Sequence, residues 1–233
     1  MLTNGLGGAL IWQLNEGYNP SAADPSSLLH AVGASFLTTS NPVASSTALS
    51  AGINPAVVGQ PVIFKATVTG DDGHVPSGSV TFKDGAASLG SAPLNAGTAS
   101  LSASFTTAGT HNITATYGGS ASYTSSASSA LAEVIAPAST ATSVVSSRNP
   151  SRRGQSVTFT ATVKVVLPGG GAPTGSVVFL DGTTQLGTAA LSASKATFST
   201  SSLGSGAHAI SARYLGSMNY AVSTSSALTQ TVR

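Results

Sequence analysis

Pro76-Ser77-Gly78-Ser79-Val80-Thr81-Phe82-Lys83-Asp84-Gly85 is the stretch that decides the fold, and it recurs as Pro173-Thr174-Gly175-Ser176-Val177-Val178-Phe179-Leu180-Asp181-Gly182. Each copy begins with a glycine turn, continues as a strand with alternating apolar residues and ends in an Asp-Gly pair typical of hairpin turns. The two copies are 97 positions apart (175 − 78). A repeat of roughly 100 residues is the length of one β-sandwich domain, so the sequence predicts two sandwiches in tandem.

Apolar residues also alternate in the strands on both sides of this motif. Before it, one face of a predicted strand is apolar in both copies: Val62, Phe64, Ala66 and Val68, then Val157, Phe159, Ala161 and Val163. After it, a second inward set recurs in register: His111, Ile113, Ala115 and Tyr117, then His208, Ile210, Ala212 and Tyr214. One apolar and one polar face are typical of antiparallel sheets covered on one side. We therefore expect an all-β fold with seven short strands per copy.

The spacing between the copies changes at one loop. Asn54-Pro55 and Asn149-Pro150 are 95 positions apart (149 − 54), whereas the motifs that follow are 97 apart. The difference falls at the longer loop 167–171 of the second copy, and insertions are tolerated best in loops. We expect one sandwich over residues 45–135, a second over 140–233, and a short Pro-containing linker around 135–139 that is semi-rigid.

Several motifs of the second copy resemble bacterial Ig-like repeats of group 3. They are Asn149-Pro150, Gly-Gln-Ser-Val-Thr-Phe-Thr-Ala-Thr-Val (154–163), Pro-Thr-Gly-Ser-Val (173–177), Gly206-Ala207-His208, and Tyr214 followed by Asn219-Tyr220. The first copy departs from the pattern at 119–123, where Gly-Ser-Ala-Ser-Tyr replaces the usual tail. The resemblance implies Ig-like β-sandwiches that serve as spacers, stalks or adhesive modules of bacterial proteins. It also implies an extracellular or cell-surface location.

Residues 1–40 form a leader with a different pattern. Gly5 to Leu14 is glycine-led and then almost wholly apolar, as in a strand buried on both faces. Asp24-Pro25 suits a helix start, and the residues after it place an apolar set on one helical face: Leu28, Leu29, Val32 and Phe36. The leader therefore predicts a strand, a loop and a helix.

Residues 5–37 resemble the final strand and helix of family-18 glycoside hydrolases, the chitinase family of (β/α)₈ barrels. Trp12 matches the family's tryptophan under the bound sugar, which implies a substrate-binding role; the alternative is a tryptophan that packs the end of a barrel. The family's acid ends a D-x-x-D-x-D-x-E motif, and neither glutamate of this chain, Glu16 or Glu133, ends such a motif. We therefore expect no catalytic residue and no enzyme activity. A lone barrel strand lacks partners, so we expect the leader, a remnant of such a barrel, to be poorly ordered or to lie against the first sandwich in a non-barrel way.

Composition excludes further classes of function. Charged residues make up 7% of the chain and the net charge is +2, which is too weak for a nucleic-acid partner. The chain has no cysteine for a disulfide or thiol zinc site, and no apolar run reaches the ~18 residues of a membrane helix. Arg148, Arg152 and Arg153 form a local basic cluster, which we interpret as a solvated turn.

The recurring polar residues have structural interpretations. His111 and His208 are not accompanied by a second recurring ligand, so we expect a ring nitrogen of each to bond backbone rather than a metal. Asp71-Asp72-Gly73 has few carboxylates for calcium and is absent from the second copy. We expect no metal and no cofactor.

Tyr123 and Tyr220 are the recurring loop aromatics, and we treat them as possible sugar-stacking residues. The first hypothesis is a non-catalytic tandem spacer or interaction module, from the C-terminal portion of a secreted chitinase-like hydrolase. The alternative is a polysaccharide-binding accessory module, with chitin as the ligand, or a surface adhesion module. We expect a monomer whose partners are polysaccharide or cell-surface components.

Overall fold

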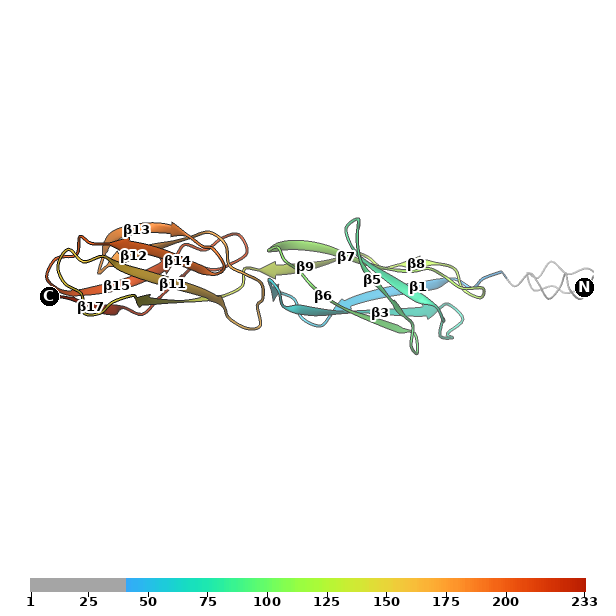
Figure 1. Ribbon diagram of the computed structural model, residues 1–233. Coiled ribbons are helices and arrows are strands. Elements are labelled where there is room, and N and C mark those ends of the chain that lie inside the picture. The colour runs from blue at the N-terminus through green and yellow to red at the C-terminus, as the bar shows by residue number, and fades with distance from the viewer. Residues whose placement is uncertain (1–40) are drawn as a thin grey trace, which may run out of the picture. The chain divides into compact units, whose positions relative to one another are not determined.

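The computed structural model describes residues 41–233, and every regular element in that range is a β-strand (Figure 1). The predicted leader, Trp12 included, lies outside the described residues. Val43–Arg233 form one compact unit. No helix in residues 41–233 has the length and apolar character needed to cross a membrane.

The first sandwich consists of two sheets. The smaller sheet has the order β1-β3-β6, with β1 (Ser45–Ala51), β3 (Pro61–Gly70) and β6 (Thr98–Ser104). The larger sheet has the order β2-β9-β7-β4-β5, with β2 (Ala56–Val57), β9 (Leu131–Ala136), β7 (Gly109–Tyr117), β4 (Ser79–Asp84) and β5 (Ala87–Pro93); β8 (Ser126–Ala127) also pairs with β7. All of these pairs are antiparallel except β2 with β9.

The second sandwich repeats this topology. Its smaller sheet has the order β10-β11-β14, with β10 (Thr140–Ser146), β11 (Val157–Val165) and β14 (Lys195–Thr200). Its larger sheet has the order β13-β12-β15-β16, with β13 (Thr184–Ala190), β12 (Ser176–Asp181), β15 (Gly206–Tyr214) and β16 (Ser223–Thr224); β17 (Leu228–Val232) also pairs with β15. A parallel bridge between Ser151 and Val232 stands where β2 pairs with β9. The seven-strand repeat is confirmed, with the two-residue strands in addition.

The alternating residues form the core of each sandwich, as the sequence predicts. Along β3 every second residue is buried, and β11 has the same alternation. The facing sheets contribute fully buried side chains: Val80, Phe82, Ile113, Ala115 and Tyr117, then Val177, Phe179, Ile210, Ala212 and Tyr214. Burying one large apolar side chain contributes about 1.5–3 kcal/mol, so these sets supply most of the driving force for folding.

Both Asp-Gly pairs lie at hairpin turns. Gly85 follows β4 with φ of 54°, and Gly182 follows β12 with φ of 57°. A left-handed backbone favours glycine because a Cβ atom would crowd the adjacent carbonyl. The turn chemistry predicted from the sequence is therefore confirmed, and it fixes the register of both hairpins.

The segment between β9 and β10 is held by backbone hydrogen bonds. Ala138 is 0% exposed, and its N–H donates to the carbonyl of Asn219 at 2.9 Å. Two further bonds join the sandwiches: the Gly170 N–H donates to the Val58 carbonyl at 3.0 Å, and the Ala108 N–H donates to Oδ1 of Asn219 at 2.8 Å. These bonds restrict the linker that the sequence predicts to be semi-rigid.

Candidate functional site

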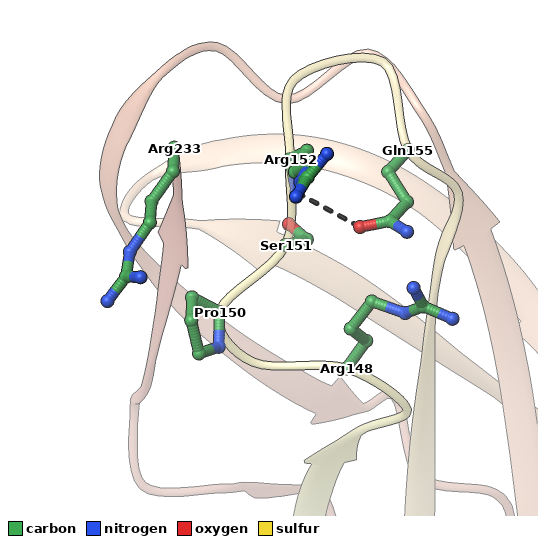
Figure 2. Close-up of a pocket in the computed structure, with 6 residues that line it drawn as sticks. All are labelled: Arg148, Pro150, Ser151, Arg152, Gln155 and Arg233. Carbon is green, nitrogen blue, oxygen red and sulfur yellow. Dashed lines mark hydrogen bonds between the residues drawn. The ribbon is translucent and has the colours of Figure 1, made fainter.

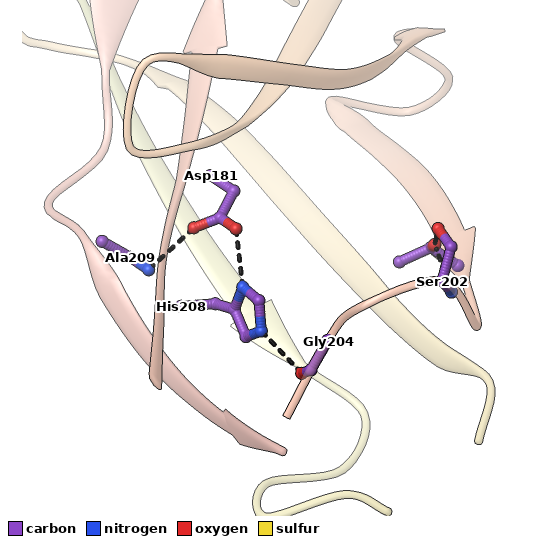
Figure 3. Close-up of polar contacts among 6 residues, drawn as sticks. Asp181, Ser202, Gly204, His208 and Ala209 are labelled. Atoms are coloured by element: carbon purple, nitrogen blue, oxygen red, sulfur yellow. Dashed lines mark hydrogen bonds and ion pairs between the residues drawn. The ribbon is translucent and has the colours of Figure 1, made fainter. Parts of the chain in front are cut away.

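A histidine–aspartate pair occupies one end of the second sandwich (Figure 3). Nδ1 of His208, on β15, lies 2.6 Å from Oδ2 of Asp181 at the end of β12. Nε2 lies 2.9 Å from the carbonyl of Gly204, and the Ala209 N–H donates to Oδ1 of Asp181 at 3.0 Å. Both ring nitrogens face acceptors, which favours the doubly protonated ring. Hydrogen bonding to Asp181, and then to Gly204, raises the pKa of His208.

The first sandwich contains the same pair. Nδ1 of His111 lies 2.6 Å from Oδ2 of Asp84, and Nε2 lies 3.2 Å from the carbonyl of Thr107. The ring of Phe105 packs against the imidazole, with centroids 4.3 Å apart. The predicted bond from a ring nitrogen to backbone is confirmed in both sandwiches, but sequence reasoning missed the carboxylate. The sequence contains a signal for it, because in each copy the aspartate of the Asp-Gly turn precedes the histidine by 27 residues.

These pairs link a hairpin end to a neighbouring loop. Each joins the end of β4 or β12 to the loop before β7 or β15, so it fixes one end of two adjacent interior strands of the larger sheet. Over residues 41–233, no group of three His, Asp or Glu side chains could hold a metal ion. The geometry is that of a structural ion pair.

Two buried tyrosines hold the opening motif in place. Tyr117 and Tyr214 are 0% exposed. Their hydroxyl groups donate to backbone carbonyls at the start of each motif, those of Ser77 at 2.7 Å and Thr174 at 2.6 Å. The inward orientation expected for both rings is confirmed, and each hydroxyl is hydrogen-bonded as buried hydroxyls require.

The two candidate sugar-stacking tyrosines are placed differently from each other. Tyr220 is 7% exposed, and its hydroxyl donates to the Gly170 carbonyl at 3.4 Å. Tyr123 is half-buried, and its hydroxyl donates to Oδ2 of Asp72 at 3.2 Å. The burial of Tyr220 leaves little ring face for a sugar, whereas Tyr123 retains some. Sugar stacking stays a prediction.

A buried polar residue in each sandwich escaped sequence reasoning. Glu133, on β9, is 0% exposed, and neither carboxylate oxygen has a hydrogen-bond partner among the described residues. Its counterpart Gln230 (230 − 133 = 97) accepts from Oγ of Ser146 at 2.6 Å and donates to the Arg148 carbonyl at 3.0 Å and to Oγ of Ser151 at 3.2 Å. The signal was visible in the sequence, because Glu133 has the same strand parity as the inward residues Leu131 and Ile135 that flank it.

The two environments differ because the first sandwich lacks the hydroxyl partners. The residues 95 positions before Ser146 and Ser151 are Ala51 and Ala56. Burial raises the pKa of Glu133, and the charge of His111, its partner across the β7–β9 pair, opposes that shift. Asp84 in turn pairs with His111. The first sandwich therefore contains a buried acid that favours its neutral form.

A pocket lies at one end of the second sandwich (Figure 2). It has a volume of about 480 Å³ and is lined by Arg148, Pro150, Ser151, Arg152, Gln155 and Arg233. Arg148 and Arg233 lie on either side of Pro150 and Ser151 in this view, and the Arg152 N–H donates to Oε1 of Gln155 at 3.0 Å. The sequence predicts a solvated turn here, and the side chains of Arg148, Arg152 and Arg153 are indeed exposed. The turn lies beside β17, through the bridge between Ser151 and Val232.

Each half of the described chain has two facing sheets and a buried tyrosine whose hydroxyl is bonded to backbone. These features define the class of Ig-like β-sandwich proteins. Residues 49–136 and 144–233 each match the bacterial Ig-like domain (group 3) family. The chain belongs to this family.

The solved structures that match the chain are distant in sequence. The fibronectin(III)-like modules of Clostridium thermocellum CbhA are 15% identical, with 79% of this chain and 92% of the other covered and a TM-score of 0.33. The D0-D1 domain of intimin is 18% identical, with 78% and 97% covered and a TM-score of 0.31. The Yersinia pseudotuberculosis adhesin InvE is 16% identical, with 78% and 58% covered and a TM-score of 0.37. No curated protein matches the chain.

Proposed function

We propose that this chain is a non-catalytic tandem Ig-like module, a spacer or interaction segment of a secreted or cell-surface bacterial protein. The two modules span residues 45–135 and 140–233. One observation supports this function above the others: the polar groups that recur in both sandwiches are bonded to their own backbone. His111, His208, Tyr117 and Tyr214 each hold a loop or turn.

The proposal extends to the origin of the chain. We propose that it forms the C-terminal portion of a chitinase-like glycoside hydrolase, and that Trp12 derives from that enzyme's sugar site. The support is the resemblance of residues 5–37 to the last strand and helix of the chitinase family. Glycoside hydrolysis needs a positioned proton donor, and no acid of this chain has the family's motif.

A pull-down with insoluble chitin tests the spacer function. A spacer stays in the supernatant, whereas a polysaccharide-binding accessory module is retained on the solid. If the chain is retained, Tyr123→Ala tests whether the half-buried ring of Tyr123 is responsible, with Tyr220→Phe as the matched control. Turnover of a chromogenic chito-oligosaccharide by the purified chain would contradict the non-catalytic proposal.

A further inference from the structure

We propose that four arginines at one end of the second sandwich bind the carboxylate or sulfate groups of an acidic polysaccharide. We name Arg148, Arg152, Arg153 and Arg233 the arginine pole. The proposal adds a ligand site to the spacer and does not depend on whether neutral chitin binds. It is based on three observations: positive charge is concentrated at this end, backbone hydrogen bonds join the two segments that carry the arginines, and the pocket beside them is lined mainly by polar and basic residues.

The fold gathers these arginines from two distant parts of the chain. Three lie in the turn between β10 and β11, and Arg233 follows β17. Backbone bonds join the two segments: the Arg153 N–H donates to the Arg233 carbonyl and the Arg233 N–H donates to the Ser151 carbonyl, both at 2.8 Å. A sheet-like contact therefore fixes the backbone from which Arg153 and Arg233 project.

The charges of the arginine pole are not used inside the protein. All four arginines are exposed, and no ion pair links any of them to an acid within residues 41–233. The pocket lining contains no Asp or Glu, and the buried residue beside it is the neutral Gln230. Arginine prefers to meet carboxylate and sulfate oxygens with two parallel N–H bonds. The guanidinium groups of the pole are thus donors that no side-chain acid of residues 41–233 engages.

The first sandwich shows that the fold does not require this charge. Its counterparts of the four arginines are all uncharged: Ile53, Val57, Val58 and Ala136. The surrounding backbone is nevertheless the same, because Asn54 and Asn149 each bond the last strand, at 2.8 Å to Ala132 and 2.6 Å to Thr229. The arginines are therefore an addition specific to the second sandwich.

The pocket chemistry favours an acidic polysaccharide over other anionic polymers. A volume of about 480 Å³ lies in the ~300–1,000 Å³ range of small-ligand pockets, so one acidic sugar unit fits. No aromatic residue lines the pocket, which removes the stacking surface used for single-stranded nucleic acids and for neutral sugars. Four charges at one end of a domain also do not make the long basic stripe of a duplex-binding protein.

Isothermal titration calorimetry at low salt tests the proposal with the full chain. Polygalacturonate and heparin supply carboxylate and sulfate polymers, dextran supplies a neutral one, and inorganic sulfate supplies the free anion. We expect both acidic polymers to bind and dextran not to bind. The triple variant R148Q/R152Q/R233Q is expected to weaken binding of at least one acidic polymer by about tenfold, because charge-assisted bonds are lost.

The matched control is K65Q/K83Q/K195Q, which removes the same charge from exposed lysines elsewhere. An equal loss of binding in both triple variants would mean non-specific attraction and would overturn the proposal. Binding of inorganic sulfate as tight as that of the polymers would overturn the polysaccharide assignment, and so would stronger binding of duplex DNA. Unchanged melting temperatures of both variants confirm that folding does not explain the result.

Discussion

Glu133 and Gln230 occupy the same place in the two sandwiches and have opposite hydrogen-bonding states. Gln230 is bonded through both its oxygen and its nitrogen, whereas both oxygens of Glu133 lack partners in the described chain. An unpartnered buried polar group costs about 1–3 kcal/mol, and a buried charge costs more. Glu133 therefore makes the first sandwich less stable than it would be with a hydrogen-bonded residue at this position.

Replacing Glu133 by glutamine stabilises the first sandwich at pH 7.5. The amide removes the ionisable group and gains an N–H. We expect this N–H to reach the Ile53 carbonyl, which is the counterpart of the Arg148 carbonyl that Gln230 reaches. We expect a gain of about 1–3 kcal/mol, measured as slower hydrogen–deuterium exchange of β9 at equilibrium. The control is the reverse replacement in the second sandwich, Gln230→Glu. We expect this variant to show faster hydrogen–deuterium exchange of β17. A faster exchange of β9 in Glu133→Gln would contradict the assignment.

The stability of the first sandwich falls as the pH rises. The pKa of Glu133 is raised above its ordinary value of 4.5, so the native state retains a proton over a range in which the unfolded chain has lost it. Between those two pKa values stability declines with a limiting slope of about 1.4 kcal/mol per pH unit, and above the native pKa the decline stops. Urea unfolding between pH 4 and 9 measures this trend. In Glu133→Gln the trend should flatten, and an unchanged slope would rule out Glu133 as its source.

At the scale of strands, the histidine–aspartate pairs join elements that are distant in sequence. Each ties the end of β4 or β12 to the loop that precedes β7 or β15. In the second sandwich Asp181 also accepts the Ala209 N–H at 3.0 Å. One carboxylate thus stabilises both a side chain and the backbone at one end of two interior strands of the larger sheet.

Removing this carboxylate lowers the pKa of His208. Since the pKa of His208 is raised in the folded protein, the stabilisation is complete below the ordinary value of about 6.5 and is lost as the pH rises through the native pKa. We expect Asp181→Asn to move the His208 titration to lower pH and to cost about 1 kcal/mol at pH 6. Two-dimensional NMR of the histidine ring measures the first effect. An unshifted titration would show that Asp181 is not the dominant partner.

The strands could be predicted from the sequence because alternation is local, whereas the polar partners depend on register across the sheet. Val62 and Phe64 reveal their face by spacing alone. The pairing of His208 with Asp181 requires β12 to lie beside β15. A local sequence pattern does not predict which strands are neighbours in a sheet. The arginine pole was only partly visible, because Arg233 joins it through a contact of β17 with the turn after β10.

At the scale of the molecule, Val43–Arg233 form a compact unit of their own. Both cores consist of residues within this range. A chain that starts at Val43 should therefore retain its β-sheet circular dichroism spectrum and melt within a few degrees of the full chain. A loss of the cooperative transition would show that residues 1–42 are needed for folding.

The bonds between the sandwiches bear on how many repeats can follow one another. The first sandwich offers the Val58 carbonyl to Gly170, and the residue of the second sandwich equivalent to Val58 is Arg153. Another repeat docked in the same manner would contact the backbone of Arg153 and would remove water from its guanidinium group without supplying a partner. Under the proposed binding, docking of a further repeat at this end and capture of an anionic glycan would therefore compete for one surface.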